Sequence, residues 1–135
     1  MIRFTCSLLS GLLLLTLLPV QAVGSSSNVR QQQEIDHLLQ FIEYSDCTFI
    51  RNNESYSGLR AREHIEKKFN YVKKRKEQIS AEEFIQYAAS RSSLSKKEYM
   101  VNCGPKTMTS EGWLVEELAR YRQFLKDGSS SQGVQ

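Results

Sequence analysis

The ten residues CTFIRNNESY, numbered 47–56, carry the pattern from which the architecture follows. Cys47–Arg51 is rich in β-branched and aromatic residues, which is typical of a short strand. Asn52 and Asn53 come next, and asparagine tolerates the positive φ angles that tight turns require. We therefore predict a turn at these two residues and a return of the chain along Glu54–Tyr56 as a second short strand.

A third extended segment, Glu98–Cys103, is stopped by the strand-breaking pair Gly104-Pro105. Since one predicted strand begins on Cys47 and this one ends on Cys103, we expect the two segments to lie close together. A bridge between these cysteines would close a loop of about 57 residues and stabilise the fold by on the order of 4 kcal/mol. The alternative is a reactive thiol, but neither cysteine lies in a C-x-x-C motif. We predict a structural disulfide.

Helical periodicity predicts four helices around these strands. Their expected bounds are about 32–45, 57–79 and 81–91, with a last helix from about residue 110. Ser80 and Glu83 form the S-x-x-E pattern of a capping box, and Ser57 is a candidate N-cap. The main expected core positions are Ile35, Leu38, Leu39, Ile42, Ala61, Ile65, Phe69, Val72, Ile79, Phe84, Ile85, Ala88, Ala89, Trp113, Leu114, Leu118, Tyr121 and Leu125. The predicted fold class is mainly α, with about four helices packed with a small antiparallel β element and one disulfide.

Residues 1–22 show the three parts of a secretory signal peptide: a positive start at Arg3, an apolar run and a small-residue cleavage site. The apolar run, Leu8–Leu18, would span only about 17 Å as a helix, against a bilayer core of about 30 Å, which disfavours a membrane anchor. Cys6 precedes this run and would be removed with it. We predict export to a Gram-negative periplasm, cleavage near Ala22 and no transmembrane span after cleavage.

The remaining chain is predicted to hold one domain. Residues 23–33 are rich in Ser and Gln and are expected to form a flexible lead-in, residues 34–126 a single helical domain, and residues 127–135 a disordered tail. The net charge of +3 for all 135 residues falls to about +2 without Arg3. A domain of this size excludes a large multidomain enzyme, a polytopic membrane protein and a disulfide-dense mini-protein.

The run S-x-C-x-F-I-R-N at residues 45–52 is the most specific of several short patterns spread over the folded part. Others are Tyr71-Val72, the serines of 92–95, Trp113-Leu114 and Tyr121-Arg122. Together they resemble a family of short exported Gram-negative bacterial proteins that is catalogued only as a domain of unknown function. The resemblance implies a periplasmic setting, and it implies no activity, ligand or catalytic residue.

A basic cluster is the most distinctive charge feature. Because acidic residues such as Glu63, Glu66 and Glu77 are interleaved with it, a solvated helix face explains the pattern, but a surface for anionic lipid or a polyanion is also open. Nucleic acid is not an expected partner in the predicted compartment. The residues of this possible basic surface are Lys67, Lys68, Lys73, Lys74, Arg75 and Lys76.

No complete catalytic or metal-binding pattern is present. Zinc sites use three or four well-spaced ligands, whereas His37 and His64 are the only histidines. Ser93 and Lys96 match S-x-x-K, but the S-D-N and K-T-G motifs that accompany it in penicillin-recognising enzymes are missing. We therefore assign no catalytic, metal or cofactor-binding residue and expect no cofactor.

The absence of a catalytic set in a small exported domain favours a non-catalytic binding or structural module of the cell envelope, with another envelope protein as its partner. Two alternatives stay open. One is a small envelope hydrolase that uses residues around Arg51, His64 and Ser93. The other is an inhibitor that blocks an attacking enzyme with an exposed loop such as Gly104–Ser110.

Overall fold

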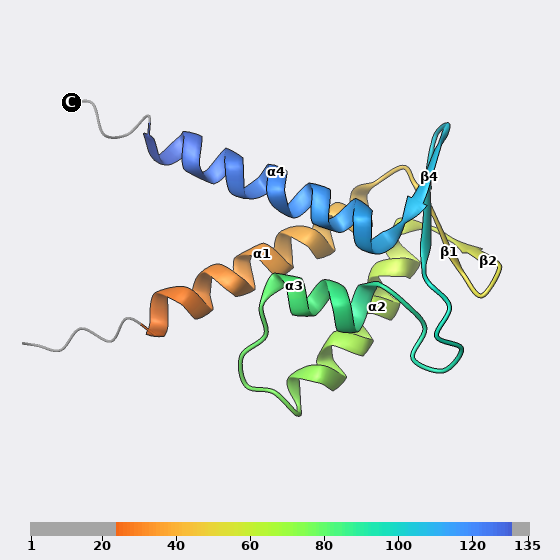
Figure 1. Cartoon of the computed structure of the whole chain (residues 1–135), viewed down its shortest axis with the longest axis horizontal. Helices are drawn as coiled ribbons and strands as arrows, with labels where there is room; N and C mark the ends of the chain where they lie inside the picture. The colour runs from red at the N-terminus through yellow and green to blue at the C-terminus, as the bar shows by residue number, and fades with distance from the viewer. Residues whose placement is uncertain (1–23, 131–135) are drawn as a thin grey trace, which may run out of the picture.

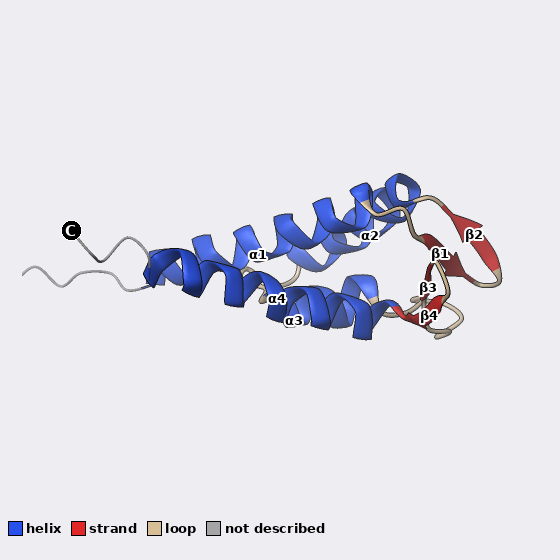
Figure 2. Ribbon diagram, turned by 90° about the horizontal axis from the view of Figure 1, so that it is seen from above, coloured by secondary structure: helices blue, strands red, loops and turns tan. Residues whose placement is uncertain are grey.

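The computed structural model describes residues 24–130 and confirms the predicted fold class: helices packed with a small antiparallel sheet (Figures 1 and 2). The sheet lies at one end of the molecule, and the N-terminal end of α1 and the C-terminal end of α4 lie at the other. The elements in chain order are α1 (Gly24–Tyr44), β1 (Thr48–Arg51), β2 (Glu54–Tyr56), α2 (Gly58–Lys73), α3 (Ala81–Phe84), the π-helix η1 (Ile85–Ala89), β3 (Met100–Cys103), β4 (Lys106–Thr109) and α4 (Ser110–Ser130).

The four strands form one antiparallel sheet in the order β2-β1-β3-β4. The predicted turn is confirmed, because Asn52 and Asn53 both adopt positive φ, 52° and 68°. Strand β4 is missing from the sequence-based prediction, which treated Gly104-Pro105 as the end of extended structure. Gly104 instead adopts a φ of 61° and reverses the chain, so that the alternating Thr residues of β4 pair with β3.

The predicted disulfide is confirmed and joins Cys47 to Cys103, with 4.5 Å between their Cα atoms. It lies beside the pairing of Thr48 with Asn102, so it continues the β1–β3 register by one residue. Both cysteines are partly buried against the hydrophobic core. The bridge therefore fixes the central strand pair that the rest of the sheet is built on.

The core lies where the helices meet the inner face of the sheet. Phe49 of β1 and Val101 of β3 are paired and buried, and they face the same side. Trp113 packs edge-on against Phe49 and is stacked on Phe41, with ring centroids 5.5 and 4.4 Å apart. The expected core positions are buried, apart from a few partly exposed ones: Val72, Tyr121 and Leu125.

The first and last helices extend beyond their predicted bounds. Helix α1 begins at Gly24 and α4 ends at Ser130, so residues 24–33 and 127–130 are helical rather than irregular. Side-chain pairs four residues apart, such as Gln32 with Asp36 and Gln123 with Asp127, support these exposed turns without core packing. The rest of the predicted lead-in and tail, residues 23 and 131–135, lies outside the described residues.

Helix α2 is shorter than predicted, since it ends at Lys73 instead of continuing to Ile79. Four consecutive cations, residues 73–76, stand at its end, and their mutual repulsion disfavours another helical turn. Ile79 is nevertheless buried, reaching the core from the irregular segment that follows. The capping box of Ser80 and Glu83 is confirmed at the start of α3, which continues as η1 and stops at Ala89.

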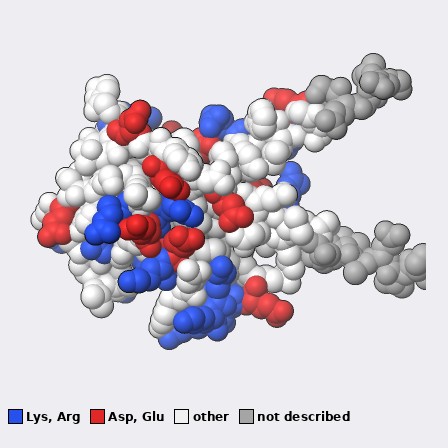
Figure 3. Space-filling view, turned by 180° about the vertical axis from the view of Figure 1, so that it is seen from behind, with Lys and Arg blue, Asp and Glu red and all other residues white. Residues whose placement is uncertain are grey.

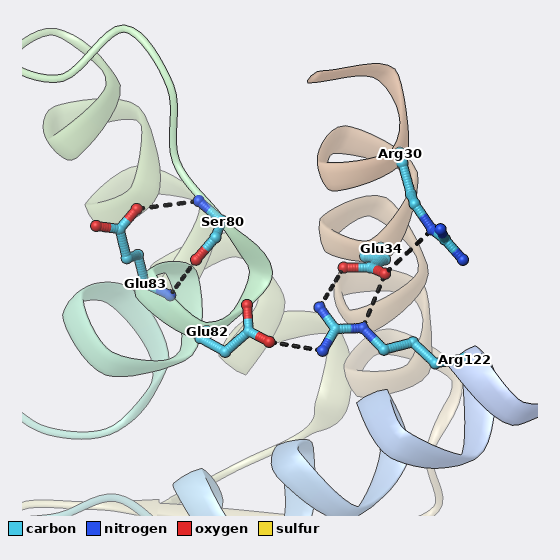
Figure 4. A network of polar contacts seen from close by, with 6 residues as sticks. All are labelled: Arg30, Glu34, Ser80, Glu82, Glu83 and Arg122. Atoms are coloured by element: carbon cyan, nitrogen blue, oxygen red, sulfur yellow. Dashed lines mark hydrogen bonds and ion pairs between the residues drawn. The ribbon is translucent and has the colours of Figure 1, made fainter. Parts of the chain in front are cut away.

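A polar cluster joins the long helices away from the sheet (Figure 4). Arg122 of α4 donates two hydrogen bonds to the buried carboxylate of Glu34 in α1, at 2.9 and 2.7 Å. Its third guanidinium nitrogen donates to Glu82 at the start of α3, at 2.6 Å. One arginine thus fixes three helices relative to one another. We call Glu34, Glu82 and Arg122 the helix clamp.

Candidate functional site

A cavity of about 300 Å³ lies between the N-terminal half of α2, the inner face of the sheet and the start of α4. This is the small end of the size range of ligand pockets. Its walls combine apolar, cationic and hydroxyl-bearing side chains. The lining includes Phe49, Arg51, Ala61, His64, Tyr99 and Ser110.

The sheet register accounts for one wall of the cavity. Phe49 pairs with Val101, and Val101 pairs with Met108. Side chains alternate along a strand, so continuing this register by two residues aligns Arg51, Tyr99 and Ser110 in a second row on the same face. The hydrogen bond from the Ser110 amide to the Tyr99 carbonyl, 2.8 Å, shows that the alignment continues beyond the strands.

Helix α2 places His64 over this row. Its Nδ1 and Nε2 atoms lie 3.0 and 3.1 Å from Nη1 of Arg51, and Nε2 lies 3.0 Å from the Tyr99 hydroxyl. Arginine can only donate, so the imidazole nitrogen that it bonds must accept, which requires neutral His64. Two tautomers satisfy both contacts: either Nδ1 accepts from Arg51 and Nε2–H donates to Tyr99, or Nε2 accepts from Arg51 and from the Tyr99 hydroxyl.

The surroundings of His64 favour that neutral form. Burial lowers its pKa, and the nearby positive charges of Arg51, Lys68 and Lys67 lower it further. Tyr99 is 5% exposed, and burial raises the pKa of its hydroxyl. Both groups are therefore uncharged at neutral pH.

The side chain of Lys68 also contacts Tyr99. Its ammonium donates to the Tyr99 hydroxyl at 3.3 Å and to the Arg91 carbonyl at 2.5 Å. Burial lowers the pKa of Lys68 to about 8, and the positive charges of Arg51 and Lys96 add to this effect. Among residues 24–130, no carboxylate forms an ion pair with either Arg51 or Lys68.

The pKa of Lys68 predicts a pH-dependent stability. Unfolded Lys68 would hold its proton up to about pH 10.5, whereas the folded protein releases it near pH 8. Between pH 8 and pH 10.5 the unfolded state binds more protons than the folded state. The charged Lys68 therefore destabilises the folded protein fully below pH 8, and this destabilisation decreases as the pH rises. The free energy of unfolding of the wild type, relative to Lys68→Met, should increase by roughly 2 kcal/mol from pH 7 to pH 10. Urea titrations followed by Trp113 fluorescence measure this difference, and a pH-independent difference would contradict the assignment.

Ser110 adds an unusual polar group to the cavity. It is fully buried, and its Oγ has no hydrogen-bond partner in the structure. An unpaired buried hydroxyl is costly. Its position as the first residue of α4 adds the partial positive charge of a helix N-terminus.

This arrangement does not form a nucleophilic triad. No hydrogen bond joins Ser110 to His64, and among residues 24–130 no carboxylate bonds the His64 ring to orient it as a base. The polar groups that line the cavity are mainly hydrogen-bond donors, and apolar side chains lie beside them.

The residues of the hydrolase alternative are only partly brought together. Arg51 and His64 are in contact, whereas Ser93 is exposed on the loop before β3 and does not line the cavity. Sequence reasoning missed Tyr99 and Ser110. The signal that could have found them is the strand register, which aligns residues 51 and 99 once Cys47 is paired with Cys103, but Ser110 also requires the unpredicted strand β4.

The inhibitor alternative relied on a long loop at Gly104–Ser110, and the structure corrects that expectation. Residues 106–109 form β4, paired along their whole length with β3. Only a tight turn at Gly104 and Pro105 joins the two strands. Backbone pairing of this segment satisfies the polar groups that a free loop would leave to solvent.

The predicted basic surface divides into two parts. Lys67 lines the cavity and Lys68 contacts Tyr99, whereas the remaining four residues lie at the end of α2 and just beyond it. There Lys73 lies over the Phe69 ring, Arg75 lies over the Tyr71 ring, and Lys76 pairs with Glu83. Figure 3 shows such basic residues gathered on one face, with acidic residues beside them. Binding of a polyanion there stays a prediction.

His37, the second histidine, does not line this cavity and contacts α4 instead. It is stacked on Tyr121 and lies 2.5 Å from the buried carboxylate of Glu117, which also pairs with Arg120. Within residues 24–130, no group of three or more His, Cys, Asp or Glu side chains is arranged to hold a metal ion. Lys96 of the S-x-x-K pattern is exposed, and it bonds the Ser93 carbonyl rather than the Ser93 hydroxyl.

Over the described part of the chain, no helix has the length and apolar character needed to cross a membrane. A family model described as a family of unknown function (DUF5329) matches residues 29–122, which include the whole cavity. No curated protein and no solved structure gives a significant match.

Proposed function

The chain belongs to the DUF5329 family, and from the geometry of its cavity we propose that it is a non-catalytic binding module of the cell envelope whose ligand occupies the space between α2, the sheet and α4. The observation that carries the proposal is the set of hydrogen-bond donors that line one cavity. Arg51 donates to His64 and to the Tyr56 hydroxyl, at 3.0 and 3.3 Å, but forms no ion pair with a carboxylate among residues 24–130, and the Ser110 hydroxyl has no hydrogen-bond partner there. A bound ligand would compensate both.

The absence of a Ser–His contact in the cavity favours binding over catalysis. A small hydrolase remains the second candidate only because Arg51 and His64 meet in a cavity. Export is supported by the signal-like residues 1–22, which lie outside the described residues, and an envelope-protein partner remains part of the proposal. Loss of residues 1–22 from protein recovered in the periplasm tests the location.

Two measurements on the purified protein test the proposal. Ring fragments that carry a carboxylate, phosphate, amide or ammonium group are titrated while backbone amide spectra are recorded, and at least one should shift the amides of Arg51, His64, Tyr99 and Ser110 together. Hydrolysis of p-nitrophenyl acetate and p-nitrophenyl phosphate should be the same for wild type and His64→Asn. If no fragment moves these amides, or if turnover depends on His64, the proposal is wrong.

A further inference from the structure

The cavity that the proposed function treats as a ligand site has an excess of positive charge. Arg51 and Lys67 line it, and Lys68 lies directly behind Tyr99. The carboxylates nearby are already engaged: Glu63 pairs with Arg60 at 3.0 Å, and Glu54 accepts a hydrogen bond from Tyr56 at 2.6 Å. Arg51 reaches Glu54 only through the Tyr56 hydroxyl, which accepts from its Nη2 at 3.3 Å, so within residues 24–130 its charge has no direct carboxylate partner.

The hydrogen-bond donors in the cavity also favour an anionic ligand. The Tyr99 hydroxyl accepts from Lys68. When the Nε2–H of His64 also donates to it, both of its acceptor positions are filled and its O–H is left to donate to a ligand. Together with the guanidinium of Arg51 and the unpartnered hydroxyl of Ser110, this gives three donors from three adjacent positions of one cross-strand row.

Another part of the lining is apolar. Phe49, in the neighbouring row of the same sheet face, and Ile65 of α2 are almost completely buried, and Ala61 of α2 also lines the cavity. Apolar walls of this kind bind the ring or aliphatic body of a ligand, while a few polar groups fix its orientation. The cavity thus offers a donor-rich row of side chains with an apolar region beside it.

We infer that the ligand is a small organic anion, in which one carboxylate or phosphate group faces Arg51, Tyr99 and Ser110 and a compact apolar body contacts Phe49, Ala61 and Ile65. The inference rests on the proposed function, because it names the ligand class of the same cavity. The Arg51 guanidinium donates from Nη1 to His64 and from Nη2 to the Tyr56 hydroxyl, and its remaining N–H groups are those that donate to either anionic group.

Matched probes separate charge from shape. Benzoate and benzamide share a ring and nearly the same outline, but only benzoate is charged, and phenyl phosphate replaces the carboxylate by a phosphate. Wild-type protein should bind benzoate or phenyl phosphate at least about tenfold more tightly than benzamide, since hydrogen bonds to charged groups exceed those to neutral ones by this order. The tighter of the two anions identifies the head group.

Variants locate the effect. Arg51→Gln should weaken binding of the preferred anion by about tenfold or more while changing benzamide binding by less than about twofold. Arg51→Lys keeps the charge but loses the planar fork and should recover only part of the affinity. Lys74→Gln is the matched control, because it removes one exposed cation from the region just after the same helix, and it should leave all affinities unchanged.

The outcomes distinguish this inference from the proposed function. Two results would overturn the inference that the ligand is an anion and leave the proposed binding function standing. One is benzamide binding in the cavity as tightly as the anions. The other is an Arg51→Gln variant whose amide spectrum shows that it is folded and which binds anions normally. Equal losses of anion affinity in Lys74→Gln and Arg51→Gln would also overturn the inference, because they would show that overall charge, not Arg51, determines the affinity. No binding of any fragment in the cavity would remove the proposed function itself.

Discussion

Replacing both cysteines, as Cys47→Ala/Cys103→Ala, should lower the free energy of unfolding by about 4 kcal/mol. The bridge joins strands β1 and β3 and closes a loop that contains β2, α2, α3 and η1. Without the bridge, this loop gains conformational entropy in the unfolded state, which favours unfolding. That amount is a large share of the roughly 5–15 kcal/mol that stabilises a typical domain. Urea unfolding followed by the fluorescence of Trp113, the single tryptophan, measures the loss.

Wild-type protein under reducing conditions is the matched control and should lose a similar amount. Intact mass of protein recovered from the periplasm adds a second reading, because it reports both the bridge and removal of residues 1–22. A stability loss below about 1 kcal/mol in the double variant, or free thiols in the periplasmic protein, would show that the bridge is not a structural element.

Breaking the helix clamp should have the next largest effect. In Arg122→Met, the carboxylate of Glu34 keeps its burial, 3% exposed, but loses both short hydrogen bonds from the guanidinium. Arg30 remains 3.9 Å away, too far to replace them. Leaving a buried charge without its partner costs about 3 kcal/mol or more. Equilibrium unfolding in urea at neutral pH measures this cost.

A double-mutant cycle and an exposed pair make the test specific. Glu34→Gln combined with Arg122→Met removes the buried charge as well as its partner, so the double variant should recover about 1–2 kcal/mol relative to Arg122→Met alone. Arg60→Met, which breaks a pair whose side chains are 70% and 52% exposed, should cost less than about 1 kcal/mol. Equal effects of Arg122→Met and Arg60→Met would contradict the assigned role of the clamp.

The elements that local sequence determines were predictable. The strand pair around Asn52 and Asn53, the N-cap Ser57 and the capping box at Ser80 depend on neighbouring residues, and the structure has all of them. The pairing of Cys47 with Cys103 followed from there being only two cysteines after the signal-like segment. These features required no knowledge of how distant elements pack.

The parts that were missed depend on long-range pairing. Strand β4 is polar and short, and its extended form is stabilised by backbone bonds to β3 rather than by its own sequence. Without β4, nothing in the sequence brings Ser110 next to Tyr99. His64 resembles a solvated helix residue in sequence, and only the packing of α2 over the sheet turns it toward Arg51 and Tyr99.

An anion should bind in the cavity between α2, the sheet and α4. Intermolecular nuclear Overhauser effects between the benzoate ring and the protein show where it binds. We expect contacts from the ring protons to Phe49, Ile65 and Tyr99, which line the cavity. Contacts found instead at the basic segment 73–76, or at no single place on the protein, would contradict the claim.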